Sequence, residues 1–274
     1  MSKFAAIQMA SGPQVAANLL AAEKLIAGAV EDGAQFVLLP ENFALMGRNE
    51  QDKLAIQEQP GSGPLQEFLA TQAKKYGIWL CGGTLPLASE DSARVYASSL
   101  VFNDQGEQVA RYDKIHLLDV QLVASNEQYN ESETILSGND PVVFETPFGR
   151  VGLSICYDLR FPELFRSLLD QGAEVILLPA AFTDFTGKAH WEILLRARAI
   201  ENLSYIVAAA QGGYHVNGRS TYGHSMIVDP WGGIVAQRES ASAGFVVGEI
   251  KQDFLSSTRR SFPALEHRKL GFGS

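Results

Sequence analysis

Cysteine is scarce in this sequence of 274 residues, which contains only Cys81 and Cys156. Two cysteines cannot build a disulfide framework, so the composition favours a protein of the reducing cytoplasm. Long apolar runs are also missing, because a run such as Tyr205–Ala210 falls far short of the roughly 20 residues of a membrane-spanning helix. The first residues show no charged stretch followed by a long apolar core, so we expect no signal peptide.

Positive charge is in deficit, with 22 Lys and Arg against 31 Asp and Glu and a formal net charge of −9. This balance argues against nucleic acid and anionic membrane surfaces as partners. The sequence has no Cys/His cluster with metal-ligand spacing, and its paired glycines form neither a dinucleotide-binding nor a phosphate-loop fingerprint. We therefore expect neither a metal nor an organic cofactor.

The chain is long enough for one large α/β domain with a substantial core. It contains no low-complexity segment, charge block or linker that would divide it, so we predict a single domain over residues 1–274.

A weak internal repeat organises the chain. Residues 33–43 resemble residues 172–182, and each segment follows a helix-like stretch that itself follows a predicted strand. Each half then continues with a strand, a turn rich in Asn, Asp and Gly, and a second strand, at residues 96–111 and 222–237. This order suggests two mixed sheets packed on each other with helices outside, but periodicity alone leaves one open doubly wound sheet as an equal alternative.

Helices are predicted where apolar residues recur at helical spacing and a glycine or proline marks an end. These segments are residues 17–29, 65–76, 163–171 and 189–202.

Cys156 follows residues 151–155, which are typical of a buried strand, and directly precedes a charged, proline-broken segment. A free cysteine is most often a small core residue, and we interpret Cys81 in this way. In parallel α/β sheets, however, reactive groups gather at the carboxyl ends of strands. The position of Cys156 therefore predicts a nucleophile.

A thiol nucleophile needs a base and a group that stabilises the oxyanion. Glu41 closes the apolar run 36–40, where a carboxylate is costly unless it has a partner or a function. The repeat carries Ala180 at the matching position, so the scaffold itself does not require the acid. Lys114 ends the first strand-turn-strand unit and is the candidate cation, although an isolated lysine is usually exposed.

The histidines offer a weaker alternative base, because none lies in a papain-like motif. We expect most of them to be structural, with His224 as the best candidate among His116, His190, His215, His224 and His267.

Three separated motifs in this order resemble the nitrilase superfamily of carbon–nitrogen hydrolases. They are residues 39–43 around Glu41, residues 112–117 around Lys114 and residues 155–163 around Cys156, and the match spans nearly the whole chain. Residues 179–182, 186–192, 196–202 and 222–225 look like the Nit branch, which includes omega-amidase and deaminated glutathione amidase. The resemblance implies an α-β-β-α sandwich of two stacked mixed sheets with internal pseudo-symmetry, assembled as a homodimer or a larger homo-oligomer.

The resemblance also implies a cofactor-free mechanism. Glu41 would take the thiol proton as Cys156 attacks an amide carbonyl, while Lys114 and the backbone N–H of Tyr157 stabilise the oxyanion. The resulting thioester would be hydrolysed by a water that Glu41 activates. Glu131 resembles a second family glutamate that would orient Lys114 or position substrate. Glu127 and Glu133 lie close to it and are alternatives.

Substrates of the Nit branch carry a carboxylate, which a cation should anchor. Arg160 and Lys188 are the candidate anchors, and either could instead form a structural ion pair. We expect an amidase acting on a small carboxylate-bearing amide, with deaminated glutathione favoured. The alternatives are an omega-amidase acting on 2-oxoglutaramate, an N-carbamoyl amino acid hydrolase, a nitrilase, or a non-catalytic binding protein of the same fold.

Overall fold

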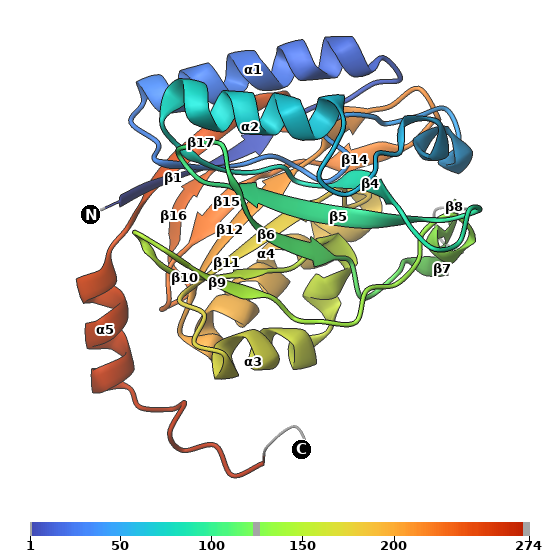
Figure 1. Ribbon diagram of the computed structural model, residues 1–274. Helices are drawn as coiled ribbons and strands as arrows, with labels where there is room; N and C mark the ends of the chain where they lie inside the picture. The colour runs from blue at the N-terminus through green and yellow to red at the C-terminus, as the bar shows by residue number, and fades with distance from the viewer. Residues whose placement is uncertain (1, 123–126, 271–274) are drawn as a thin grey trace.

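Two mixed sheets lie face to face between two layers of helices (Figure 1). The computed structural model describes residues 2–122 and 127–270. Hydrogen bonds order the first sheet as β17 (Gly244–Ile250), β1 (Ser2–Gln8), β2 (Phe36–Leu38), β3 (Trp79–Cys81), β5 (Val95–Phe102) and β4 (Leu85–Ala88), with β6 (Gln108–Asp113) also paired to β5. The second sheet has the order β16 (Ile234–Gln237), β15 (Met226–Val228), β12 (Tyr205–Ala210), β11 (Val175–Ala180), β10 (Gly149–Leu153) and β9 (Val143–Thr146).

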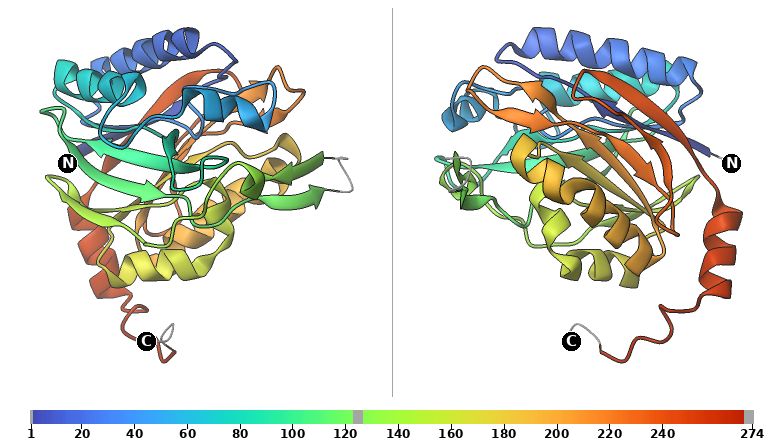
Figure 2. Two further views of the ribbon diagram at one scale, coloured as in Figure 1. Left: turned by 45° about the vertical axis from the view of Figure 1, so that its right-hand side comes forward. Right: turned by 180° about the vertical axis from the view of Figure 1, so that it is seen from behind.

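The helices form the outer layers. α1 (Val15–Glu31) and α2 (Pro64–Tyr76) cover the first sheet, and α3 (Pro162–Asp170) and α4 (Asp184–Asn202) cover the second, as both views of Figure 2 show. α5 (Gln252–Ser261) leads away from the sandwich toward the C-terminus. Shorter elements complete the chain: η1 (Glu50–Ile56), η2 (Glu131–Glu133), η3 (Cys156–Arg160), the pair β7 (Asp119–Leu122) and β8 (Glu127–Asn130), and the pair β13 (Gly212–Tyr214) and β14 (Ser220–Tyr222).

The predicted internal repeat is confirmed. β1, β2 and β3 are parallel and connected through α1 and α2, and β10, β11 and β12 are parallel and connected through α3 and α4. Each parallel triplet then continues into antiparallel strands, β5 and β6 in the first half and β15 and β16 in the second. The structure is therefore a four-layer α-β-β-α sandwich and not one open doubly wound sheet.

Burial follows this layering. One core cluster joins residues of both sheets with α3 and α4, and a second cluster lies between the first sheet and α1 and α2. Strands such as β11 and β12 are buried on both faces, which explains their continuous apolar sequence. The carboxyl ends of the parallel strands are thus held rigidly, and the loops that follow them carry the predicted reactive residues.

Most helix boundaries agree with the sequence prediction within two residues, and α4 is the exception. We predicted a start at residue 189, but α4 begins at Asp184 after Thr183, whose hydroxyl accepts a hydrogen bond from Thr186 N at 3.1 Å. Gly187 lies within the added turns, and a Cβ at this position would lie 2.3 Å from the side chain of Tyr222. The glycine therefore allows the first turns of α4 to pack closely against β14.

Candidate active site

Cys156 lies at a sharp turn between β10 and α3. The strand ends at Leu153, two residues earlier than predicted, and Cys156 opens η3 with a φ of 46°. A non-glycine residue rarely adopts this left-handed conformation, which costs about 1–3 kcal/mol unless the surroundings impose it. The side chain of Cys156 is almost fully buried, with 5% of the residue exposed.

The carboxylate of Asp158 holds this turn in place. It is fully buried and accepts hydrogen bonds from Ile155 N at 2.8 Å and from the Tyr112 hydroxyl at 2.7 Å. It also accepts from His116 N at 3.1 Å and lies 2.7 Å from His116 Nδ1. Asp158 therefore connects the turn that carries Cys156 to the segment that carries Lys114.

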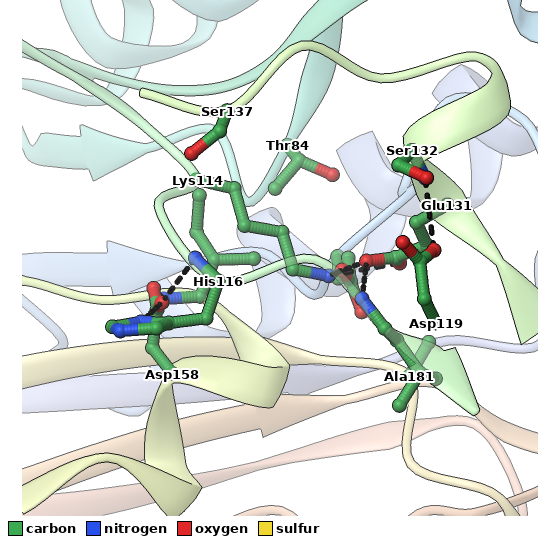
Figure 3. Close-up of polar contacts among 12 residues, drawn as sticks. Thr84, Lys114, His116, Asp119, Glu131, Ser132, Ser137, Asp158 and Ala181 are labelled. Atoms are coloured by element: carbon green, nitrogen blue, oxygen red, sulfur yellow. Dashed lines mark hydrogen bonds and ion pairs between the residues drawn. The ribbon is translucent and has the colours of Figure 1, made fainter. Parts of the chain in front are cut away.

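Lys114 lies at the centre of a buried ionic cluster (Figure 3). Its side chain is fully buried, and its Nζ donates to Glu41 Oε1 at 2.9 Å. It also donates to both carboxylate oxygens of Glu131, at 2.9 Å and 2.8 Å. Glu131 is fixed in turn by Leu118 N, which donates to its Oε2 at 2.7 Å. The structure thus brings the predicted acid, cation and second glutamate together.

The backbone of Glu41 is positioned by buried polar contacts. Gln211 donates to the carbonyl oxygen of Glu41 at 3.0 Å, and Asn42 N donates to the Thr84 hydroxyl at 2.8 Å. Gly83 lies directly behind this loop with a φ of 59°, and a Cβ there would lie 2.0 Å from the carbonyl oxygen of Pro40. Only glycine allows the two backbones to approach this closely.

The electrostatics of the cluster keep the thiol and the ammonium protonated. Burial raises the pKa of Cys156 well above its usual value, the charge of Glu41 raises it further, and Lys114 offsets only part of this. Burial alone would lower the pKa of Lys114, but the charges of Glu131 and Glu41 outweigh it and raise the pKa. For Glu131, the nearby Lys114 outweighs burial and lowers the pKa. The resting site therefore holds a neutral thiol beside a charged lysine.

A cavity of about 260 Å³ contains Cys156, the candidate nucleophile, and is also lined by Arg160 and the aromatic ring of Phe182. The Arg160 guanidinium lies 5.2 Å from the centre of the Phe182 ring, and its Nη1 lies 3.1 Å from His190 Nδ1. Tyr157 also lines the cavity and is the second residue of η3, a position where a helix offers no acceptor for the backbone N–H. Arginine and this N–H group are the donors that a small anionic amide would meet.

The second predicted anchor, Lys188, has a different environment. Its side chain is 67% exposed and pairs with Asp184 at 2.6 Å within α4. Among the residues described, it does not line the cavity that contains Cys156. The geometry favours Arg160 over Lys188 as the cation that meets substrate.

Of the remaining candidates, Glu133 and Cys81 occupy structural positions. Glu133 accepts from Asn130 at 3.1 Å on the surface, away from Lys114, and the side chain of Glu127 lies outside the described residues. Cys81 is buried against the Ser99 hydroxyl at 3.1 Å, and burial raises its pKa to about 11. The position of Glu133 favours Glu131 as the second glutamate, and the contacts of Cys81 place it in the core.

The histidines make structural contacts. His116 stacks on Phe161 with ring centres 3.8 Å apart, and His224 stacks on Tyr222 at 3.9 Å. His215 lies between the carbonyl oxygen of Ser11 and the Thr221 hydroxyl. His190 contacts Arg160 beside the cavity, whereas His116, His215 and His224 make the stacking and hydrogen-bonding contacts of structural residues.

Three residues near the site escaped the sequence prediction. Asp158 and Gln211 act through contacts with residues distant in the chain, which no local pattern reveals. Arg219 lies in the loop between β13 and β14, where its guanidinium donates to the carbonyl oxygen of Ala181 at 2.7 Å. Ala181 lines the cavity that also contains Cys156. No local pattern in the sequence marks Arg219 as a site residue.

Within the described ranges, no group of three or more His, Cys, Asp or Glu side chains is arranged to hold a metal ion. None of the helices described is long and apolar enough to cross a membrane.

Comparison with known proteins places this site in a family context. Residues 3–260 match the model of the carbon-nitrogen hydrolase family. The chain is 45% identical over 267 residues to the deaminated glutathione amidase of Synechocystis, covering 96% of this chain and 97% of that protein. Among solved structures, the C. elegans NitFhit protein is 38% identical with a TM-score of 0.89, and the match covers 98% of this chain and 65% of NitFhit. A variant of the amidase from Nesterenkonia sp. AN1, 26% identical with a TM-score of 0.77 over 97% of this chain and all of that one, shows the Michael addition of acrylamide at its active-site cysteine.

Proposed function

The chain belongs to the carbon–nitrogen hydrolase family and is a hydrolytic amidase, and we propose that it cleaves a small carboxylate-bearing amide through a thioester on Cys156. The observation that carries this proposal is the burial of Cys156 beside one cluster of Glu41, Lys114 and Glu131. These groups supply a nucleophile, a base and a charged donor without a cofactor.

Acylation begins from the neutral thiol. Because the raised pKa of Cys156 disfavours a free thiolate, the proton must leave as the sulfur attacks the amide carbon. Glu41 is the carboxylate in electrostatic contact with the sulfur that can receive it. The developing oxyanion would be stabilised by the ammonium of Lys114 and by the backbone N–H of Tyr157. Glu41 then returns the proton to the departing nitrogen, and the acyl group remains on sulfur.

Deacylation repeats the same proton transfers with water. Glu41, again ionised, activates a water that attacks the thioester, and Lys114 again faces the oxyanion. Glu131 holds Lys114 in place through both carboxylate oxygens and maintains its charge. The carboxylate product then leaves, and the thiol is regenerated.

Deaminated glutathione is the substrate that we favour, because relatives at 45% identity bear that name and Arg160 faces the cavity. The chemical alternative, 2-oxoglutaramate, shares the same 2-oxoglutaryl acyl group and differs in its leaving group, which is ammonia instead of cysteinylglycine. Both would place an oxo acid carboxylate near Arg160. N-carbamoyl amino acids and nitriles remain less supported, and a non-catalytic role would leave the complete ionic cluster without a purpose.

A substrate panel tests this proposal. We expect hydrolysis of deaminated glutathione to exceed that of 2-oxoglutaramate, N-carbamoyl amino acids and simple nitriles, measured as release of the acid product. Esterification of the oxo acid carboxylate should lower kcat/KM steeply, because the Arg160 charge then stays unpaired. Arg160→Met should remove most of that preference, whereas Lys188→Met serves as the matched control. Equal hydrolysis of acid and ester would contradict carboxylate recognition.

We also propose that residues 1–274 form a single carbon–nitrogen hydrolase domain that acts in the cytoplasm as a homodimer or larger homo-oligomer. The scarcity of cysteine supports the compartment. Exposed aromatic side chains at Trp231 and Phe262, whose rings pack edge to face at 5.5 Å, support self-association. Phe262 therefore touches its own chain and still leaves about half of its surface exposed for a contact with a second copy.

A further inference from the structure

A second, polar cavity lies next to the ionic cluster and plays no part in the mechanism above. It has a volume of about 310 Å³ and is lined by polar residues of η1, β8 and the loop between β13 and β14, including Arg48, Glu50, Tyr129 and Arg219. Asn42, the residue after Glu41, and Arg219 also line a smaller adjoining cavity. The polar space therefore extends from the loop that carries the general base to Arg219.

Arg219 has donor capacity that the described part of the chain does not use. Its Nη2 donates to the Ala181 carbonyl, and its guanidinium lies 4.8 Å from the centre of the Tyr129 ring. Its Nε is buried and has no hydrogen-bond partner among the described residues. A buried guanidinium donor without an acceptor is costly, and a carboxylate is the acceptor that fits its planar fork.

The charge balance of this cavity suits an anion. Glu50 is its acidic residue, but Lys53 lies 2.6 Å from the Glu50 carboxylate and neutralises it. Arg48 and Arg219 both line the cavity, so two guanidinium groups face it against one paired carboxylate. An anionic group entering here would meet a net positive surface.

Arg219 is also close to the reacting atoms. Ala181 links the two, because its carbonyl accepts from Arg219 and the residue lines the cavity that contains Cys156. The charge of Arg219 acts on both Glu41 and Cys156. Glu41 protonates the leaving nitrogen in the proposed mechanism, so the leaving group departs on the Glu41 side, toward this cavity.

We propose that the Arg219 cavity binds a carboxylate on the leaving amine, so that the enzyme recognises an amide that carries an anionic group at each end. Arg160 would hold the oxo acid on the acyl side, and Arg219 would hold the leaving group. This inference rests on the proposed function and makes it more specific. Of the two substrates considered above, deaminated glutathione has such a leaving-group carboxylate, on its glycine, and 2-oxoglutaramate has none.

A pair of substrates that differ at one group tests the inference. The first is deaminated glutathione, and the second is the same molecule with its glycine carboxylate converted to a carboxamide. Wild-type enzyme should hydrolyse the acid with a kcat/KM roughly 10- to 100-fold above that of the carboxamide. In Arg219→Gln this ratio should fall toward one, mainly through KM for the acid. Arg219→Lys, which keeps the charge without the fork, should retain an intermediate ratio.

Two controls separate the possible outcomes. Arg160→Met should lower kcat/KM for both compounds and leave their ratio unchanged, because both carry the same acyl group. If Arg219 only fixes its loop to Ala181, Arg219→Gln should slow both compounds equally, and an unchanged ratio would overturn the inference. A wild-type enzyme that hydrolyses both equally would overturn it while the proposed function stands. Hydrolysis of neither compound would overturn deaminated glutathione as the substrate and this inference with it.

Discussion

Replacement of Lys114 by methionine tests how much the buried ionic cluster contributes to stability and turnover. The change keeps most of the side-chain volume but removes the one ammonium that donates to both Glu41 and Glu131. Removing one partner of a buried ion pair leaves an uncompensated charge and costs about 3–5 kcal/mol. Glu41 and Glu131 are 5% and 17% exposed at the side chain, so solvent can relieve little of that cost. We expect Lys114→Met to lose stability by this amount and to lose turnover.

The pH dependence of that loss follows from Glu131. In the wild type its pKa is lowered, so the associated stability is present above the unfolded pKa and is lost as the pH falls through the folded value. Without Lys114, burial dominates and raises the pKa of Glu131, which reverses the sign: stability is then greatest at low pH and is lost as the pH rises. The difference in unfolding free energy between wild type and variant should therefore grow as the pH rises from below the unfolded pKa of a glutamate.

Urea denaturation of both proteins across this range measures the effect. Addition of Glu131→Gln to the Lys114→Met variant should recover part of the lost stability, because it removes an unpaired buried charge. Lys188→Met is the matched control, since it breaks an exposed pair with Asp184 and should cost about 0–1 kcal/mol. A Lys114→Met variant that matches the wild type in stability at every pH would refute the account of the cluster.

Three further predictions follow from the same structure. Glu41→Gln should keep its fold and lower kcat by roughly 10²–10⁴-fold or more, since Glu41 acts in several proton transfers. A near wild-type rate in a steady-state assay would exclude Glu41 as the base. Asp158→Asn should lower the unfolding free energy by about 1–3 kcal/mol and reduce kcat, because the amide N–H₂ would face the donors now bonded to the carboxylate. An unchanged unfolding midpoint in heat or urea would contradict the role of Asp158 in fixing the turn at Cys156. Light scattering at micromolar concentration should show at least a dimer. If Trp231 and Phe262 lie in the contact, the double substitution Trp231→Ser and Phe262→Ser should weaken the dimer. A stable wild-type monomer would rule out self-association.

Sequence reasoning predicted the residues of the candidate site from recognisable local patterns. Cys156 and Glu41 come after buried apolar runs. The internal repeat has Ala180 at the position equivalent to Glu41, so the glutamate is not needed by the scaffold. The same repeat predicted the order of strands and helices that the two sheets display. Periodicity alone left open whether the two halves form one sheet or two, because it carries no information on which strands pair. The resemblance to the nitrilase superfamily implied two stacked sheets, which the structure confirms.

The residues that sequence reasoning missed depend on contacts between distant segments. Gln211 bonds to Glu41 across 170 residues, and Asp158 connects to Tyr112 across 46. Arg219 approaches the site because β14 packs closely beside the first turns of α4 at Gly187. Such partners become visible only when the fold brings them together.

Mass spectrometry of the intact protein and of its peptides shows whether Cys156 carries the acyl group. Acid quenching during turnover of deaminated glutathione should trap a mass increase equal to a 2-oxoglutaryl group on the peptide that contains Cys156. The adduct should be cleaved by hydroxylamine, as a thioester is, and Cys156→Ala should show neither adduct nor turnover while keeping its fold. Turnover by the Cys156→Ala variant, or an adduct on a different residue, would contradict the account.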